Sequence, residues 1–336
     1  MAGPDFRCIK FDPSERYKEI TMLKYSIKFA RIRIIATCFA LAFLGSAYAG
    51  SITYKTLFSL ILIIGFTIHA NSVNDYSDRE IDKVNLKNAA DRPLVTQDIN
   101  TKQLWVINIL SALLILVVSL FYGGDVLILG VAIILIDYAY SLKPVRMTNR
   151  TIISPILLSI SYVYYSFSIG FLSVFSHRSF PWLLTVGLTI GFFARLLLKD
   201  FRDKKGDKKF GKITFLLRYG QQATCVTSGI FWLLALSIIT VANSFSIGLA
   251  LPLLLAFLQA VVLLRKLLRT DKLDMQQRLI SYIAKGANYT IITLLTYFLC
   301  KNAISIDSWQ TQVISASVGL VLIIFNWLEY RLHSND

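Results

Sequence analysis

The sequence predicts an all-α, polytopic membrane protein built as a bundle of transmembrane helices. Of its 336 residues, 55% are hydrophobic and only 16% are charged. A soluble domain of this length normally has about a quarter of its residues charged. Apolar runs of roughly 18 to 20 residues recur throughout, which is typical of helices that cross a bilayer.

The expected elements follow in order along the chain. A polar arm of mixed charge, residues 1–27, comes first, and its composition predicts no cleavable signal peptide. Ten apolar spans follow, at 30–49, 54–73, 104–122, 125–141, 151–175, 180–199, 222–243, 246–264, 286–304 and 312–330. The two longer loops between them, 83–103 and 208–221, are long for a compact bundle and are candidates for a lid.

The distribution of positive charge predicts the orientation. A net charge of +15 would suit a nucleic-acid partner, but in a membrane protein excess lysine and arginine marks cytoplasmic loops. With the N-terminus inside, 31 of the 35 lysines and arginines fall on the inner side. We therefore expect no nucleic-acid binding, and an integral protein of the cell inner membrane or its equivalent with both termini in the cytoplasm.

An acidic stretch, Asn71 to Asp82, stands where the second span reaches water. On a helix its acidic and amide side chains share one face, because they recur at steps of three and four residues. Carboxylates crowded in this way repel one another, and oxygen ligands of this kind suit Mg²⁺. A solvated helix end is the simpler interpretation of this stretch taken alone.

A second acidic stretch, Lys199 to Asp207, repeats the spacing with Asp200, Asp203 and Asp207. The predicted topology places both stretches on the cytoplasmic face. Two acidic helix ends in a basic, apolar chain need a shared explanation. We expect a diphosphate held by Mg²⁺ between them.

In its motifs the chain resembles the UbiA superfamily of intramembrane prenyltransferases. The first family motif is met by Asn74, Asp75, Asp78 and Asp82, and is followed by Arg92-Pro93-Leu94. The motif Y-S-x-x-P-x-R is met by Tyr140, Ser141, Pro144 and Arg146. The motif K-D-x-x-D-x-x-G-D is met by Lys199 to Asp207, and Gly211, Thr214, Arg218 and Gly220 follow it in family order.

The resemblance implies a fold and a site. The fold would be a bundle of about nine core transmembrane helices around a central, lipid-open cavity, here residues 28–304. The tenth predicted helix, within residues 305–336, departs from the family. Mg²⁺ would be held by Asn74, Asp78, Asp82, Asp203 and Asp207, with Asp75 and Asp200 as further catalytic carboxylates. The candidate diphosphate-binding residues are Arg31 or Arg33 (of which we choose Arg33), Arg92, Lys143, Arg146 and Lys199.

The implied activity is transfer of an isoprenoid chain from a prenyl diphosphate to a small lipophilic or aromatic acceptor through an allyl cation. An aromatic quinone-type precursor is our first choice of acceptor and a glycerol-phosphate ether our second. A UbiA-type terpene cyclase is an alternative with the same ionisation step. A divalent-cation transporter is another, although transport needs carboxylates near the bilayer midplane rather than at helix ends.

Two polar residues within predicted spans complete the candidates. His69 is more often a packed, hydrogen-bonded histidine than a base at such a position. Arg195 would be costly in a span unless it lines a cavity or pairs with an acid, and it is therefore a candidate functional residue.

Overall fold

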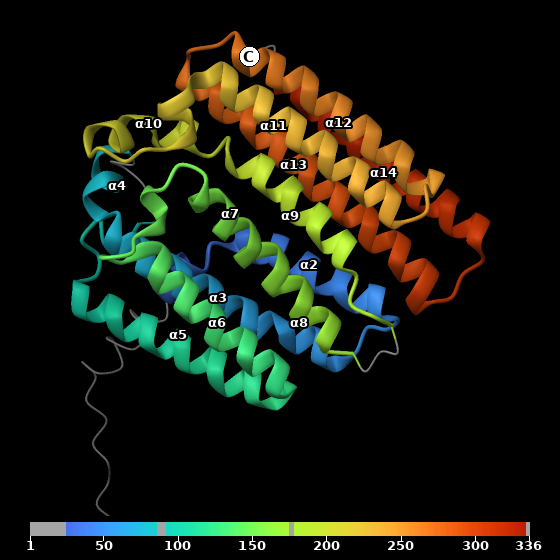
Figure 1. The fold of residues 1–336 in the computed structure, drawn as a ribbon, viewed down its shortest axis with the longest axis horizontal. Helices are drawn as coiled ribbons and strands as arrows, with labels where there is room; N and C mark the ends of the chain where they lie inside the picture. Colours follow the sequence, from blue (N-terminus) through green and yellow to red (C-terminus); the bar gives the residue numbers. More distant parts are fainter. Residues whose placement is uncertain (1–24, 86–91, 175–177, 334–336) are drawn as a thin grey trace, which may run out of the picture.

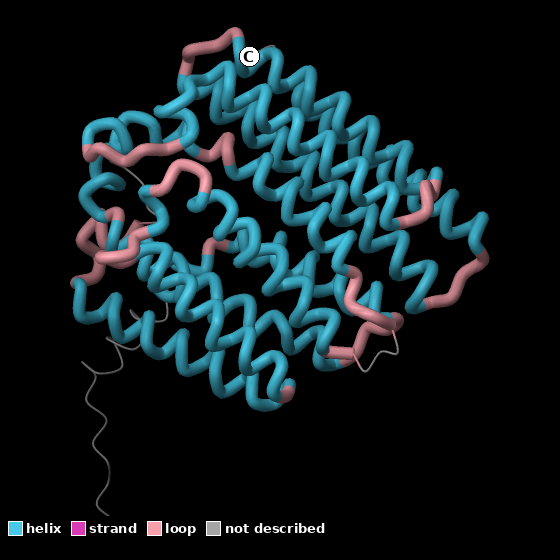
Figure 2. Tube along the Cα trace, in the orientation of Figure 1, coloured by secondary structure: helices cyan, strands magenta, loops and turns pink. Residues whose placement is uncertain are grey.

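The computed structural model describes residues 25–85, 92–174 and 178–333, and the described residues form helices without any strand. All ten predicted spans coincide with helical segments, so the all-α membrane fold predicted from the sequence is confirmed (Figures 1 and 2). The helices at these spans are α2 (Ile32–Ala49), α3 (Tyr54–Ser77), α5 (Thr101–Tyr122), α6 (Gly124–Ser141), α7 (Ile153–Ser159) continued by the π-helix η2 (Ile160–Tyr165) and α8 (Ser166–Leu172), α9 (Trp182–Leu196), α11 (Phe215–Ala242), α12 (Ile247–Leu268), α13 (Leu273–Phe298) continued by the π-helix η3 (Leu299–Ala303), and α14 (Ser308–His333).

Three short elements lie between these long helices. They are α4 (Arg79–Asn85), the 3₁₀ turn η1 (Met147–Asn149) and α10 (Asp200–Lys209). Figure 1 shows α4 and α10 side by side at one end of the bundle, and the two helices are in contact. Most of the predicted arm, residues 1–24, and the middle of the first predicted lid, residues 86–91, lie outside the described residues.

Not every span is a simple membrane crossing. Among the described residues, eight helical segments are long and apolar enough to cross a bilayer. Helix α9 has only 15 residues and is joined to α10 across a bend of 57°, so the pair is not one straight crossing. Helix α13 is long, but Asp274, Arg278 and Lys285 make its first half polar.

The second predicted lid is mostly helical. Helix α11 starts at Phe215, seven residues before its predicted start, because the Thr214 hydroxyl accepts a hydrogen bond from the Leu217 amide and caps it. A kink at Gly220, with φ of 82°, separates this first turn from the apolar part of the helix. Only residues 210–214 are left as a non-helical connection.

Small residues bring α2 and α8 into close contact. A Cβ added at Gly170 would lie 1.7 Å from the Ala42 carbonyl oxygen, and one added at Gly45 would lie 2.2 Å from that of Phe167. The Ser46 hydroxyl also donates a hydrogen bond of 2.7 Å to the Gly170 carbonyl oxygen. Close backbone approach and hydrogen bonds between helices are the usual means by which helices associate in lipid. The lipid tails are as apolar as the helix surfaces, so the hydrophobic effect does not drive the helices together.

The outward faces of the outer helices are apolar, as expected of a surface that meets lipid. Exposed large apolar side chains run along α5, α11 and α14, and include Leu110, Phe121, Ile230, Val321 and Phe325. The polar and charged groups discussed below lie inward or at the end of the bundle that carries α4 and α10. The fold therefore provides one polar end on an apolar body.

We predict that Gly170→Ala separates α2 from α8 and destabilises the protein. The added methyl group would overlap backbone rather than a flexible side chain, so the cost should be about 3 kcal/mol. Thermal unfolding of the purified protein measures the effect. Gly124→Ala is the matched control, because nothing lies within 4 Å of a Cβ at Gly124. Equal melting temperatures for the two variants would show that this contact is not limiting.

Candidate active site

The two acidic stretches meet where α4 packs against α10. Helix α3 ends at Ser77 and α4 begins at Arg79, so the first stretch spans two helices with Asp78 between them. The Gly206 amide donates a hydrogen bond of 2.6 Å to the Asn85 side-chain oxygen. A Cβ at Gly206 would lie 2.6 Å from the Asn85 amide nitrogen. The glycine of the second motif thus lets the two acidic helices approach each other.

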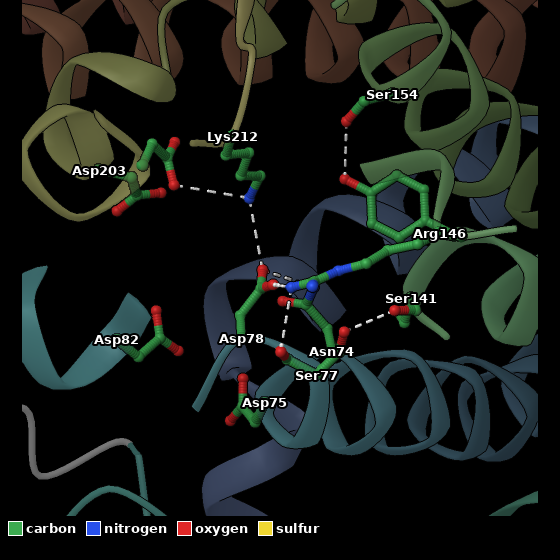
Figure 3. Close-up of polar contacts among 12 residues, drawn as sticks. Asn74, Asp75, Ser77, Asp78, Asp82, Ser141, Arg146, Ser154, Asp203 and Lys212 are labelled. Carbon is green, nitrogen blue, oxygen red and sulfur yellow. Dashed lines mark hydrogen bonds and ion pairs between the residues drawn. The ribbon is translucent and has the colours of Figure 1, made fainter. Parts of the chain in front are cut away.

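One lysine joins the two stretches directly. The Lys212 ammonium lies 3.4 Å from Asp78 Oδ2 and 3.7 Å from Asp207 Oδ1 (Figure 3). Burial alone would lower the pKa of Lys212, but the carboxylates of Asp78 and Asp207 outweigh it and hold that pKa above its ordinary value. Lys212 is therefore a permanent cation between the motifs.

Three arginines hold the carboxylates of the first motif. Arg31 lies 2.6 Å from Asp75, and Arg146 lies 2.9 Å from Asp78. Arg92 lies 3.1 Å from Asp75 and 3.0 Å from Asp82, and so joins both of them. The remaining member of the motif, Asn74, donates a hydrogen bond of 3.3 Å to Asp78.

Two of these arginines have unusual backbones. Arg31 has φ of 47° and Arg146 has φ of 36°, in the left-handed region that residues other than glycine rarely adopt. Arg31 precedes α2, and Arg146 precedes the 3₁₀ turn after α6. The surrounding structure must stabilise these conformations, since each costs of order 1–3 kcal/mol. Strain of this kind is typical of residues whose side chains are held in a functional position.

The second motif lines a small polar pocket. Its lining residues include Lys199 and Asp200 of the motif, together with Lys212, Arg150 and Ser154. Asp203 pairs with the neighbouring Arg202 at 2.8 Å and faces the same region as Asp82 in Figure 3. Positive side chains outnumber negative ones around this pocket, so it suits an anion.

The chemistry of the donors fits Mg²⁺. Burial and the nearby carboxylates of Asp75, Asp78 and Asp203 raise the pKa of Asp82 to about 8, and a cation would relieve that repulsion. Asp207 Oδ1 is buried and accepts no hydrogen bond. Within residues 25–85, 92–174 and 178–333, no three histidine, cysteine, aspartate or glutamate side chains lie close enough together to hold an ion. This agrees with the usual manner of Mg²⁺ binding, through one or two carboxylates together with water and phosphate oxygens.

Not all predicted residues lie at this site. Arg33 and Lys143 are exposed, and within the described parts of the chain neither forms an ion pair. At the start of the first span, Arg31 and not the chosen Arg33 contacts the first acidic motif, through Asp75. His69 is fully buried, with Nδ1 3.0 Å from Asp137 Oδ2, as expected of a packed histidine.

Sequence reasoning missed Lys212. It follows four other lysines between positions 204 and 209, and no spacing rule distinguishes it from them. The only signal was its place between Gly211 and Thr214 of the last motif. Arg150 was missed for a different reason: an arginine between two spans usually only marks the inner side of the membrane.

Comparison with known sequences decides the family. The sequence model of the UbiA prenyltransferase family matches residues 34–292, which include both acidic stretches and the helices that carry them. This chain belongs to the UbiA prenyltransferase family. The matched region ends before α14, so the last helix lies outside it.

Related sequences within the UbiA family are distant. The chain is 26% identical over 193 residues to digeranylgeranylglyceryl phosphate synthase of Pyrococcus horikoshii, and the alignment covers 56% of this chain and 66% of that protein. It is 27% identical over 199 residues to the chloroplastic 2-acyl-4-prenylphloroglucinol 6-prenyltransferase of Humulus lupulus, covering 56% of this chain and 47% of that protein. The matches thus span about half to two thirds of the length of these relatives.

Solved UbiA structures share the fold. A structure from work on digeranylgeranylglyceryl phosphate synthase in membranes has a TM-score of 0.62 at 20% identity, covering 83% of this chain and 99% of that one. A UbiA homologue from Archaeoglobus fulgidus bound to GPP and Mg²⁺ has a TM-score of 0.56 at 14% identity, covering 90% of this chain and 98% of that one.

We predict that Arg92→Met destabilises this UbiA-family fold in the absence of Mg²⁺. The substitution leaves Asp75 and Asp82 buried without their shared cation, which typically costs about 3–5 kcal/mol. Thermal unfolding in EDTA measures the loss. Lys83→Met, which removes an ion pair with the exposed Glu80, is the matched control and should cause no measurable change. Equal stability of the two variants would mean that Arg92 does not neutralise the site.

Proposed function

We propose that this protein is a Mg²⁺-dependent membrane prenyltransferase that moves an isoprenoid chain from a prenyl diphosphate to an acceptor. The observation that carries the proposal is the convergence of both acidic motifs on Lys212, beside a pocket with excess positive charge. Carboxylates and cations in one small volume are what a diphosphate with its metal ions requires: the carboxylates for the metal and the cations for the free oxygens.

An apolar cavity is lined by the same end of α9 as the polar pocket. Leu41, Leu188, Phe192, Trp232 and Ile239 are among its lining residues. The polar pocket is lined by Leu196, the last residue of α9, and by Lys199 just before α10. The pocket proposed for the diphosphate therefore has an apolar space beside it.

The chemical step begins when the bond between the allylic carbon and the diphosphate oxygen breaks, and the electron pair leaves with the diphosphate. Lys199, Lys212 and Arg146 are the residues proposed to stabilise the negative charge that develops on the leaving group. The acceptor nucleophile then forms the new bond to the allylic carbon and loses a proton. The apolar cavity keeps water away from the allyl cation in the interval.

Mg²⁺, when bound, would neutralise diphosphate charge, and Asn74, Asp78, Asp82, Asp203 and Asp207 are the residues proposed to hold it. Asp75 and Asp200 are proposed as further carboxylates of the same site. Arg92 is proposed to hold the carboxylates of the first motif in position through Asp75 and Asp82. Arg33 and Lys143 lack the contacts of the other cations, so we replace them in the proposal with Arg31 and Lys212.

Two kinds of relatives suggest two classes of acceptor. Those named as digeranylgeranylglyceryl phosphate synthases point to a glycerol-phosphate ether, and those named as acylphloroglucinol prenyltransferases point to an aromatic ring. Either would attack the same allyl cation. An aromatic quinone-type precursor and a glycerol-phosphate ether are therefore the two acceptors to test first.

We predict that Asp78→Ala or Asp203→Ala lowers turnover at least 100-fold while the protein remains folded, because each removes an oxygen ligand that metal-bound diphosphate needs. Asp125→Ala, which changes an exposed acid at the start of α6, is the control and should retain full activity. The assay follows release of diphosphate and prenylated product with Mg²⁺, a prenyl diphosphate and each acceptor. Full activity of Asp203→Ala would remove the second motif from the site.

The same assay distinguishes the rival functions. A cyclic hydrocarbon formed from labelled prenyl diphosphate without any acceptor would identify a terpene cyclase instead. Movement of Mg²⁺ into liposomes without prenyl turnover would identify a transporter. Transfer to an added acceptor, dependent on Mg²⁺ and lost with EDTA, is the result that we expect.

We further propose that both termini and the acidic site face the cytoplasm, because the loops on that side hold most of the positive charge. In a Cys8→Ser background, a cysteine introduced at exposed Lys208 should react with an impermeant maleimide only from the cytoplasmic side. A cysteine at Asp125 should react only from the other side. Reversed labelling of the two positions would overturn the orientation. The remaining cysteines, Cys38, Cys225 and Cys300, are buried.

A further inference from the structure

Arg195 is a cation inside the helix bundle that the diphosphate site does not use. It lies in the last turn of α9 and lines the apolar cavity together with Leu41, Phe192 and Trp232. The other side chains that line this cavity are apolar or, at Thr290, a single hydroxyl. Arg195 is therefore the only charged group among the described residues that line it.

No carboxylate compensates this charge. Among the described residues, no aspartate or glutamate lies within ion-pair distance of Arg195. From the described residues it has one hydrogen bond, in which Nη1 donates to the side-chain oxygen of Asn288 at 2.8 Å. A guanidinium has five N–H donors, and an unpaired charge in a bilayer-spanning bundle is costly, so a position of this kind is normally retained for a function.

The guanidinium is held in place. Its central carbon lies 5.3 Å from the centre of the Phe192 ring, at a distance typical of a cation–π contact. The Asn288 side chain that accepts from Arg195 belongs to α13. The guanidinium is thus held by contacts from α9 and α13 while Arg195 lines the cavity.

The cavity of Arg195 is distinct from the diphosphate pocket. The residues that line the two spaces do not overlap: Arg195 belongs to the first, and Lys199, across the bend between α9 and α10, belongs to the second. An anionic group bound at Arg195 would therefore occupy a space separate from that of a diphosphate bound at Lys199 and Lys212.

We propose that Arg195 binds an oxyanion on the acceptor, a phosphate monoester or a carboxylate, and so selects acidic acceptors over neutral ones. The inference rests on the proposed function, since it assigns the acceptor side of the same reaction. A planar guanidinium is the side chain that best matches either oxyanion, because it can donate two parallel hydrogen bonds. The apolar walls around it would accommodate the uncharged part of the acceptor.

The test compares binding of matched acidic and neutral probes to the purified protein in detergent, by isothermal titration calorimetry. One pair is an alkylglyceryl phosphate and the corresponding alkylglycerol, and the other is 4-hydroxybenzoate and its methyl ester. The variants are Arg195→Gln, Arg195→Lys and, as a control, Arg265→Gln, which changes an exposed arginine on α12. Affinity for a prenyl thiodiphosphate with Mg²⁺ is measured in parallel.

We expect the wild-type protein to bind the acidic member of at least one pair about tenfold more tightly than its neutral partner. Which pair shows the preference distinguishes a phosphate acceptor from a carboxylate acceptor. Arg195→Gln should abolish the preference without changing affinity for the neutral probe or the thiodiphosphate. Arg195→Lys should recover part of it, and Arg265→Gln should behave as wild type.

Three results would overturn the inference. They are equal binding of acidic and neutral probes by the wild-type protein, equal weakening of both by Arg195→Gln, and loss of thiodiphosphate affinity with the acidic preference unchanged. The last would assign Arg195 to the diphosphate. If the acidic preference depends on Arg195 but no prenylated product forms with Mg²⁺ and prenyl diphosphate, the proposed function fails while the anion site stands.

Discussion

Neutralisation of six carboxylates at one end of an apolar bundle is the constraint on which the rest of the structure depends. Acidic side chains this close together, and partly withdrawn from water, cannot all remain charged without nearby cations. The protein supplies those cations from distant parts of the chain. Arg31 comes from before the first long helix, Arg146 from the turn after α6, and Lys212 from the connection to α11.

The same arrangement explains how the site would exchange partners. Under the proposed function, carboxylates that pair with protein cations in the absence of ligand would bind metal ions, and the released lysines and arginines would bind phosphate oxygens. The bend between α9 and α10 places Lys199 and Asp200 directly after an apolar helix, so this exchange would take place beside an apolar space. The left-handed backbones at Arg31 and Arg146 hold two of the cations at the edge of this region.

Local patterns were enough to predict the fold class and the position of every long helix. Hydrophobic run length and the burial requirement of backbone polar groups in lipid leave few alternatives to a helical bundle. The three- and four-residue spacing also indicated the carboxylates of both motifs. Boundaries were less predictable: the early start of α11 depends on the Thr214 cap and the Gly220 kink, which hydropathy does not register.

The cationic half of the site could not be predicted in the same way. Arg33 and Arg31 are equivalent by position, and only the turn at Arg31 decides which of them reaches Asp75. Lys212 gains its role from the packing of α4 on α10 through Gly206, a contact between residues more than 120 positions apart. Arg195 could be identified from the sequence as costly, but its hydrogen-bond partner, Asn288, lies on another helix almost a hundred residues away.

A double-mutant cycle between Asp78 and Asp203 tests the central claim most directly. The quantity measured is the affinity of the purified protein for a prenyl thiodiphosphate in saturating Mg²⁺, for wild type, Asp78→Ala, Asp203→Ala and the double variant. If both acidic motifs together bind one metal-bound diphosphate, either single variant should lose nearly as much affinity as the double variant. Losses that add independently, or an unchanged affinity in Asp203→Ala, would contradict the account.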